Sequence, residues 1–152
     1  MTIYKSEQIF EWLSEVADPE IPVLTITDLG IVRDVDCSEG VTVSLTPTYS
    51  GCPATEVIEA SVVAALEDRG VIDVRIERVL SPPWTTDWIS EEGRDKLRVY
   101  GIAPPERRRR PIACPRCDSE ETERVSEFGS TACKAAYRCR DCLEPFEYFK
   151  CL

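Results

Sequence analysis

The sequence predicts an α+β fold, in which a small mixed sheet with helices on one face is followed by a C-terminal four-cysteine zinc ribbon. Two observations carry this prediction. Residues 4–80 read as helix, strand, strand, helix, strand, with short alternating strand patterns between the two helices and after the second. In addition, six of the eight cysteines lie in the last 39 residues, and four of them form two C-x-x-C pairs.

The first predicted helix covers residues 4–17, with Ser6 as its N-cap. Apolar side chains recur along it at the spacing of one helical face. They are Ile9, Phe10, Leu13, Val16 and Ala17. A loop with two prolines follows, and then "IVRDVDC" and "VTVSLTP" alternate as two strands joined by the turn "SEG".

The second predicted helix covers residues 53–69, between Pro53 at its first position and Gly70 at its end. Its expected buried face consists of Val57, Ala60, Ser61, Ala64 and Ala65. The strand "VIDVRIERVL" follows. Because a helix connects the second and third strands, we expect them to be parallel with a right-handed crossover.

The segment "SPPWTTDW" reads as a rigid aromatic loop, and residues 89–99 as a third helix with Ser90 as N-cap. We therefore expect three parts: residues 1–104, an Arg-rich linker at 105–111, and a zinc ribbon at 112–152. The run Arg107–Arg110 could hold phosphate. A solvated linker that binds back to an acidic domain is the favoured interpretation.

Composition excludes several classes of function. The net charge is −10, and residues 1–104 carry 8 basic and 19 acidic residues, a charge of −11 that disfavours nucleic acid. No histidine is present, which rules out imidazole acid–base chemistry and a ferritin-like diiron site in this chain. No apolar run could span a membrane and no signal peptide is evident, so we expect a cytoplasmic protein with no membrane partner.

The two C-x-x-C pairs predict a metal site with four thiolate ligands, which tetrahedral zinc accepts. The ligands are Cys114, Cys117, Cys139 and Cys142. Iron or an iron–sulfur cluster is the alternative. Cys133 and Cys151 remain outside the set, either as small buried apolar residues or as a second, transient metal site.

Cys52 stands apart from the other cysteines, between a strand and the second helix. With Pro53 at the first helical position, Cys52 is the expected N-cap, where unpaired N–H groups and the helix dipole favour the thiolate. A cap with no chemical role is the alternative. Ser, Thr, Asp or Asn would cap better, however, so a cysteine here favours a function.

Long motifs resemble known families. "DPEIPVLTITDLGIVRDV" and "VSLTPTYSGCPATEVIEASV" resemble the SufT-like family involved in iron–sulfur protein assembly, over residues 6–82. The "PPWTTDWIS" extension and the ribbon "FGSTACKAAYRC" resemble the D subunit family (PaaD) of the bacterial phenylacetyl-CoA epoxidase system. The resemblance implies a reactive Cys52 and matching acidic positions at Asp18 and Asp28, which together could bind iron or a cluster.

The resemblance also implies a role in aerobic phenylacetate catabolism. The chain would be an accessory component of a multisubunit phenylacetyl-CoA monooxygenase, a 1,2-epoxidase. Its partners would be the reductase and oxygenase subunits and iron–sulfur assembly proteins. We expect a factor that helps assemble or insert an iron–sulfur cluster or iron, with structural zinc and a transiently held iron or cluster. The alternative is a structural subunit that bridges oxygenase and reductase. An independent enzyme is disfavoured because no histidine base accompanies Cys52.

The parallel pairing of strands two and three would place their carboxyl ends at one edge of the sheet. Trp84, Thr85 and Asp87 follow strand three, and Cys52 follows strand two. We therefore expect these residues to lie near Cys52, with Asp18 brought there by the first loop. Apolar cover would limit water access, and carboxylates can bind iron(II). The alternative is that the tryptophans only pack against the domain.

Overall fold

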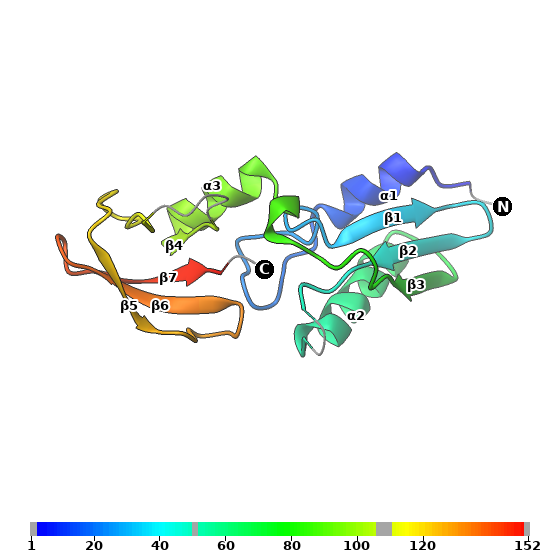
Figure 1. The fold of residues 1–152 in the computed structure, drawn as a ribbon. Coiled ribbons are helices and arrows are strands. Elements are labelled where there is room, and N and C mark those ends of the chain that lie inside the picture. Colours follow the sequence, from blue (N-terminus) through cyan, green and yellow to red (C-terminus); the bar gives the residue numbers. More distant parts are fainter. Residues whose placement is uncertain (1–2, 50–51, 106–110, 151–152) are drawn as a thin grey trace. The chain divides into compact units, whose positions relative to one another are not determined.

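The computed structural model describes residues 3–49, 52–105 and 111–150, which form two compact units (Figure 1). Unit 1 comprises residues 1–89 and unit 2 residues 90–152. The third helix is thus grouped with the ribbon. The sequence-based boundaries at residues 104 and 112 stay a prediction. Arg107–Arg110 and Cys151 lie outside the described residues.

Unit 1 contains a three-stranded mixed sheet of order β1-β2-β3 (Figure 1). Strands β1 and β2 are antiparallel, and β2 and β3 are parallel, as the sequence predicts. Helices α1 and α2 pack against each other, α1 also against β1 and α2 against β3, which gives the predicted sheet with helices on one face. The elements are α1 (Ser6–Leu13), β1 (Val32–Asp36), β2 (Val41–Leu45), α2 (Ala54–Glu67), β3 (Val74–Arg78) and the short 3-10 helix η1 (Thr86–Trp88).

Helix α2 buries a different face from the expected one. Its buried residues are Ala54, Ile58, Val62 and Leu66. The expected row was wrong, since Val57 is 51% exposed and lies on the side of the helix away from that buried row. The i, i+4 row of larger aliphatic side chains removes more apolar surface from water than the alanine row does, and so it faces the sheet.

Helix α1 also begins differently from the prediction. Its N-cap is Lys5, without a side-chain cap hydrogen bond, and Ser6 is the first helical residue. The Ser6 hydroxyl instead donates to the Val35 carbonyl oxygen at 2.9 Å. Ser6 therefore ties α1 to β1, and its expected capping role was wrong.

The aromatic loop after β3 packs onto the loop that precedes β1. The Trp84 side chain is only 5% exposed, and its Nε1 donates to the Leu29 carbonyl oxygen at 2.7 Å. The Arg33 guanidinium lies 3.7 Å from the Trp88 ring centroid. Gly30 has φ +72°, and a Cβ there would come within 2.7 Å of the Trp88 carbonyl oxygen. This close approach requires a glycine.

The described part of unit 2 contains a four-stranded sheet of order β4-β7-β6-β5 and one helix. Strands β4 and β7 are parallel, and the other pairs are antiparallel. Ser90 caps the helix by accepting from the Gly93 N–H at 3.0 Å, which confirms the predicted N-cap. The elements are α3 (Glu91–Tyr100), β4 (Ile102–Ala103), β5 (Thr122–Ser126), β6 (Lys134–Cys139) and β7 (Pro145–Phe149).

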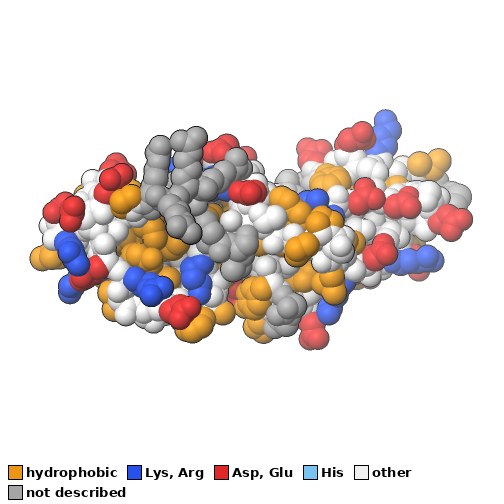
Figure 2. Space-filling model, in the orientation of Figure 1, with side chains coloured by type: hydrophobic (Ala, Val, Ile, Leu, Met, Phe, Trp, Pro, Cys, Tyr) orange, Lys and Arg blue, Asp and Glu red, His pale blue; other side chains and the backbone are white. Residues whose placement is uncertain are grey.

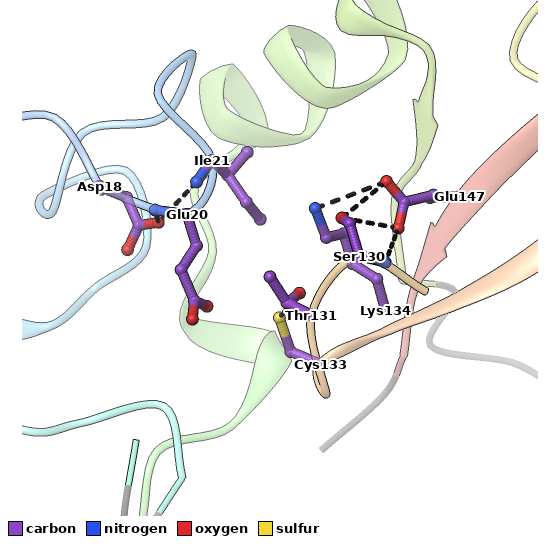
Figure 3. A network of polar contacts seen from close by, with 8 residues as sticks. All are labelled: Asp18, Glu20, Ile21, Ser130, Thr131, Cys133, Lys134 and Glu147. Carbon is purple, nitrogen blue, oxygen red and sulfur yellow. Dashed lines mark hydrogen bonds and ion pairs between the residues drawn. The ribbon is translucent and has the colours of Figure 1, made fainter. Parts of the chain in front are cut away.

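An ion pair between a buried lysine and a partly exposed glutamate fixes the loop between β5 and β6. The Lys134 Nζ lies 3.6 Å from Glu147 Oε1, and only 5% of the lysine side chain is exposed. The Ser130 N–H donates to Glu147 Oε2 at 2.7 Å (Figure 3). A charge buried to this degree needs such a partner, and the pair therefore anchors this loop to β7.

No helix in the described residues is long and apolar enough to cross a membrane. On the face drawn in Figure 2, acidic and basic side chains are interspersed among patches of hydrophobic ones.

Candidate functional site

The four predicted ligand cysteines come together in unit 2. Two similar turns present them. In each turn the N–H of the first cysteine donates to a carbonyl oxygen five residues later, Cys114 to Ser119 at 2.9 Å and Cys139 to Glu144 at 3.0 Å. In each turn the residue four positions after that cysteine has a positive φ, at Asp118 and Leu143. The repeated backbone geometry explains why both pairs can present two thiols in the same direction.

The sulfur atoms fit a tetrahedral ion. All four lie within 4.8 Å of one another, with 3.7 Å between the Sγ atoms of Cys114 and Cys142 and 3.6 Å between those of Cys117 and Cys139. Zn–S bonds of about 2.3 Å in tetrahedral geometry place the sulfurs about 3.8 Å apart. The donor set and its spacing therefore fit a metal ion such as zinc.

Backbone amides support the thiolates. The N–H groups of Arg116 and Cys142 approach the Sγ atoms of Cys114 and Cys139 at 3.4 and 3.5 Å. The amide of Cys142 is the main cause that lowers the pKa of the Cys139 thiol to about 7. Such donors stabilise the deprotonated sulfur that a metal binds.

The metal site is part of the small core of unit 2. Cys114 and Cys139 are fully buried and pack with Ala103 and Phe146. Cys133 is also buried, but it lies outside the four-sulfur group, and its Sγ is 3.0 Å from Thr131 Oγ1. Its surroundings fit the predicted role of a small buried residue more closely than a second metal site.

A second candidate site lies in unit 1, where Cys52 lines a small cavity of about 20 Å³. The cavity lies where β2 and β3 end and α2 begins, as the parallel pairing of these strands predicts. The lining residues are Asp18, Glu20, Ile31, Leu45, Pro47, Thr48, Cys52, Ala54, Thr55, Ile58 and Arg78. The structure thus brings together Cys52 and Asp18, two of the residues singled out from the sequence.

Cys52 is not the N-cap of α2. The helix begins at Ala54, its N-cap is Pro53, and Pro53 already has helical backbone angles and makes no side-chain cap bond. The Cys52 carbonyl oxygen accepts from the Thr55 N–H at 3.2 Å, so a tight turn leads into the helix one residue later than expected. The half-buried Cys52 side chain therefore lies beside the start of α2 and lines the cavity.

Asp18 is held by the loop that it begins. Its Oδ1 accepts from the N–H groups of Glu20 at 2.9 Å and Ile21 at 2.8 Å (Figure 3). Only 7% of Asp18 is exposed. These bonds fix the orientation of the carboxylate at the cavity.

Asp28 stabilises a turn of the first loop instead of lining the Cys52 cavity. Its Oδ2 accepts from the Thr25 N–H at 3.0 Å, and its own N–H donates to Thr25 Oγ1 at 3.1 Å. This reciprocal pair closes the turn over residues 25–28 ("TITD"), and Asp28 does not line the Cys52 cavity. A role for Asp28 at the site stays a prediction.

The aromatic loop residues do not line this cavity either. Trp84 is buried against Leu29, and Thr85 Oγ1 accepts from the Asp87 N–H at 2.9 Å to cap η1. These contacts agree with the alternative interpretation, in which the tryptophans only pack against the domain. A shared site with Cys52 remains a prediction for Trp84, Thr85 and Asp87.

Arg78 is a cavity residue that the sequence patterns did not reveal. It pairs with Leu45 across the two parallel strands, and its guanidinium donates to Glu59 on α2 through Nε at 2.5 Å and Nη2 at 3.0 Å. The hydrogen bond with Glu59 is the main cause that raises the pKa of Arg78. An arginine at the end of a strand gives no sequence signal for this role, since its partner lies 19 residues earlier.

Two family models match the chain, one over each unit. Residues 6–77 match a family described as iron-sulfur cluster assembly proteins, and residues 103–150 match the PaaD zinc beta ribbon domain. The class of protein is therefore an iron–sulfur assembly domain followed by a zinc ribbon.

Similar proteins define the class further. A protein of Escherichia coli named as the D subunit of a putative 1,2-phenylacetyl-CoA epoxidase is 51% identical over 95% of this chain and 92% of its own length. An Fe-S protein maturation auxiliary factor of Porphyromonas gingivalis is 42% identical over 60% of this chain and 89% of its own. The chain belongs to the family of 1,2-phenylacetyl-CoA epoxidase D subunits.

Solved structures resemble the assembly domain. A conserved hypothetical protein of Thermotoga maritima has a TM-score of 0.52 and 32% identity, covering 64% of this chain and 98% of its own. A domain of unknown function from Bacillus anthracis has a TM-score of 0.56 and 28% identity, covering 60% of this chain and 90% of its own.

Proposed function

We propose that this chain is an accessory component of a phenylacetyl-CoA epoxidase system that helps assemble or insert the iron–sulfur cluster or iron of the reductase or oxygenase. The observation that carries the proposal is the cavity that Cys52 shares with Asp18 in the domain matched to iron–sulfur assembly proteins. Membership in the family of 1,2-phenylacetyl-CoA epoxidase D subunits supports the proposed pathway, aerobic phenylacetate catabolism.

The chemistry of the cavity suits iron in transit. A thiolate is a soft ligand for iron, and carboxylate oxygens suit hard cations. Among the described residues, Cys52 is the cavity's single thiol. Stable clusters are held by four thiolates. A site with one thiolate therefore favours transient binding and release over permanent storage.

In this proposal the two units have different roles. The four thiolates of unit 2 hold zinc as a structural ion, and the ribbon provides the surface that contacts the recipient protein. The cavity of unit 1 holds the iron or cluster. Iron–sulfur assembly proteins supply that iron or cluster, and the reductase and oxygenase receive it.

In the experiment, the reductase is produced together with the oxygenase in four preparations. One preparation lacks this chain, and the other three contain its wild-type form, Cys52→Ser or Cys37→Ser. Cys37 is the matched control, because it is a half-buried thiol of the same unit that does not line the Cys52 cavity. We expect the iron content of the purified reductase to fall at least twofold without the chain and with Cys52→Ser, and to stay normal with Cys37→Ser. Equal iron content in all four preparations would contradict the proposal and favour a bridging structural role.

A further inference from the structure

The geometry of Arg78 indicates a cationic hydrogen-bond donor, oriented by an ion pair, at the Cys52 cavity. Its Nε and Nη2 atoms are occupied by the carboxylate of Glu59, which holds the guanidinium plane in place. Its Nη1 atom takes no part in that pair, and no other hydrogen bond of Arg78 is found within the described residues. One amino group of this half-exposed guanidinium is therefore outside the pair with Glu59, on a side chain that lines the cavity.

The cavity lining carries both signs of charge. Asp18 and Glu20 supply carboxylates, and Arg78 supplies a cation. The charge of Arg78 is offset by Glu59, so an Fe²⁺ ion alone would be attracted by the carboxylates but would leave the free N–H groups of the guanidinium without an acceptor. A simple anion would be attracted by the guanidinium and repelled by the carboxylates. A ligand with a positive and a negative end, namely iron bonded to sulfide, is complementary to both sides.

The size of the cavity sets a further condition. About 20 Å³ gives room for about one water-sized group. A whole cubic cluster would have to remain at the mouth, with one of its atoms entering. The thiolate of Cys52 can then bind the iron at the edge of that cluster.

We infer that Arg78 is a binding residue for the sulfide of an iron–sulfur cargo, and that this site accepts iron with sulfide in preference to Fe²⁺ alone. The inference rests on the proposed function and names its cargo. Arg78 Nη1 donates a charge-assisted hydrogen bond to sulfide, as donors near cluster sulfurs do in other proteins. The Cys52 thiol releases its proton to solvent, the thiolate so formed replaces one ligand of the incoming iron, that ligand departs into solvent or with the donor protein, and no electron is transferred.

The test uses the full, zinc-loaded chain under anaerobic conditions with two probes, Fe²⁺ alone and Fe²⁺ with sulfide. Iron, sulfide and zinc per chain are measured after gel filtration, so that iron exchanged into the ribbon is recognised by the loss of zinc. The variants are Arg78→Gln, Arg78→Lys, Cys52→Ser and Arg75→Gln. Arg75 is the matched control, because it is an exposed arginine of the same strand β3 that does not line this cavity.

We expect Arg78→Gln to reduce iron uptake from Fe²⁺ with sulfide at least threefold, without reducing uptake of Fe²⁺ alone. Arg75→Gln should behave as wild type, and Arg78→Lys should restore most of the uptake because it keeps a cationic donor. Unchanged uptake in Arg78→Gln would overturn the inference. So would an equal loss with both probes, or a loss in Arg78→Lys as large as in Arg78→Gln, because each would show a structural role.

The same measurements separate this inference from the proposed function. If Cys52→Ser retains all iron uptake with both probes, the proposed iron site at Cys52 fails, whatever Arg78 does. If Cys52→Ser loses uptake and Arg78→Gln does not, the iron site stands and only the role of Arg78 fails.

Discussion

The two units of this chain are stabilised in different ways. The largest fully buried side chains among the described residues are concentrated in unit 1, and only Leu97 and Phe149 of that group belong to unit 2. The core of unit 2 is instead a small cluster in which two metal-ligand cysteines, Cys114 and Cys139, are fully buried members. Unit 1 therefore depends on apolar packing, and we expect unit 2 to depend on a metal ion held by its four cysteines.

The comparison extends to the use of cysteine. In unit 2 four thiols converge with sulfur spacings that fit one ion, and their backbone turns leave little freedom. In unit 1 the Cys52 thiol lines a cavity with carboxylates and a guanidinium. The first arrangement favours tight, permanent binding, and the second leaves room for exchange. The difference predicts that Cys→Ser has a large effect on stability in unit 2 and a small one in unit 1.

The largest expected effect is that of Cys114→Ser. It removes one of four thiolates, and metal binding at such sites contributes roughly 10–16 kcal/mol to folding. Elemental analysis should find about one zinc per wild-type chain and almost none in the variant. Unit 2 should become sensitive to protease. All three tryptophans, Trp12, Trp84 and Trp88, belong to unit 1, so unfolding followed by tryptophan fluorescence should remain close to wild type.

Full zinc retention in Cys114→Ser would contradict the ligand assignment. Loss of the tryptophan-detected transition would contradict the independence of the two units. The control is Cys133→Ser, which changes a buried thiol of the same unit outside the four-sulfur group and should retain zinc.

A smaller effect is expected from Gly30→Ala in unit 1. The new Cβ would lie 2.7 Å from the Trp88 carbonyl oxygen and 2.8 Å from the Trp88 Cβ, at a φ of +72°. Left-handed strain and overpacking together should lower the free energy of unfolding by about 2–4 kcal/mol. Tryptophan fluorescence during urea unfolding measures this change, and zinc content should not change.

Gly70→Ala is the matched control for that substitution. Gly70 has φ +86°, but a Cβ there meets nothing within 4 Å. Only the backbone strain should appear, about 1–2 kcal/mol. Equal losses in the two variants would show that the close approach of Gly30 to Trp88 adds no steric cost to the backbone strain.

The sequence predicts best what depends on local spacing. The metal ligands are paired within two tight turns, so their spacing alone predicts the site. The mixed sheet follows from the order of helices and strands. These features need no knowledge of long-range packing.

The features that sequence patterns miss depend on tertiary packing. The buried face of α2 is decided by which row of side chains fits the sheet, and the alanine row was the wrong choice. Arg78 is positioned by its hydrogen bond with Glu59, which forms only when helix α2 packs beside the end of β3. The start of α2 at Ala54 moves Cys52 out of the N-cap position, a shift of one residue that pattern recognition does not resolve.

The smallest expected effect on stability is that of Cys52→Ser, the same chemical change as Cys114→Ser. Cys52 is half-buried, belongs to no metal cluster in the described residues and does not cap the helix, so its sulfur supports little of the fold. The free energy of unfolding of unit 1 should change by no more than about 0.5 kcal/mol, as for substitutions outside cores and networks. Urea unfolding followed by tryptophan fluorescence gives this value, and the zinc content should equal that of wild type. A loss above about 2 kcal/mol would mean that the thiol is part of the packing around α2, and any loss of iron loading in the same variant would then no longer identify Cys52 as a ligand.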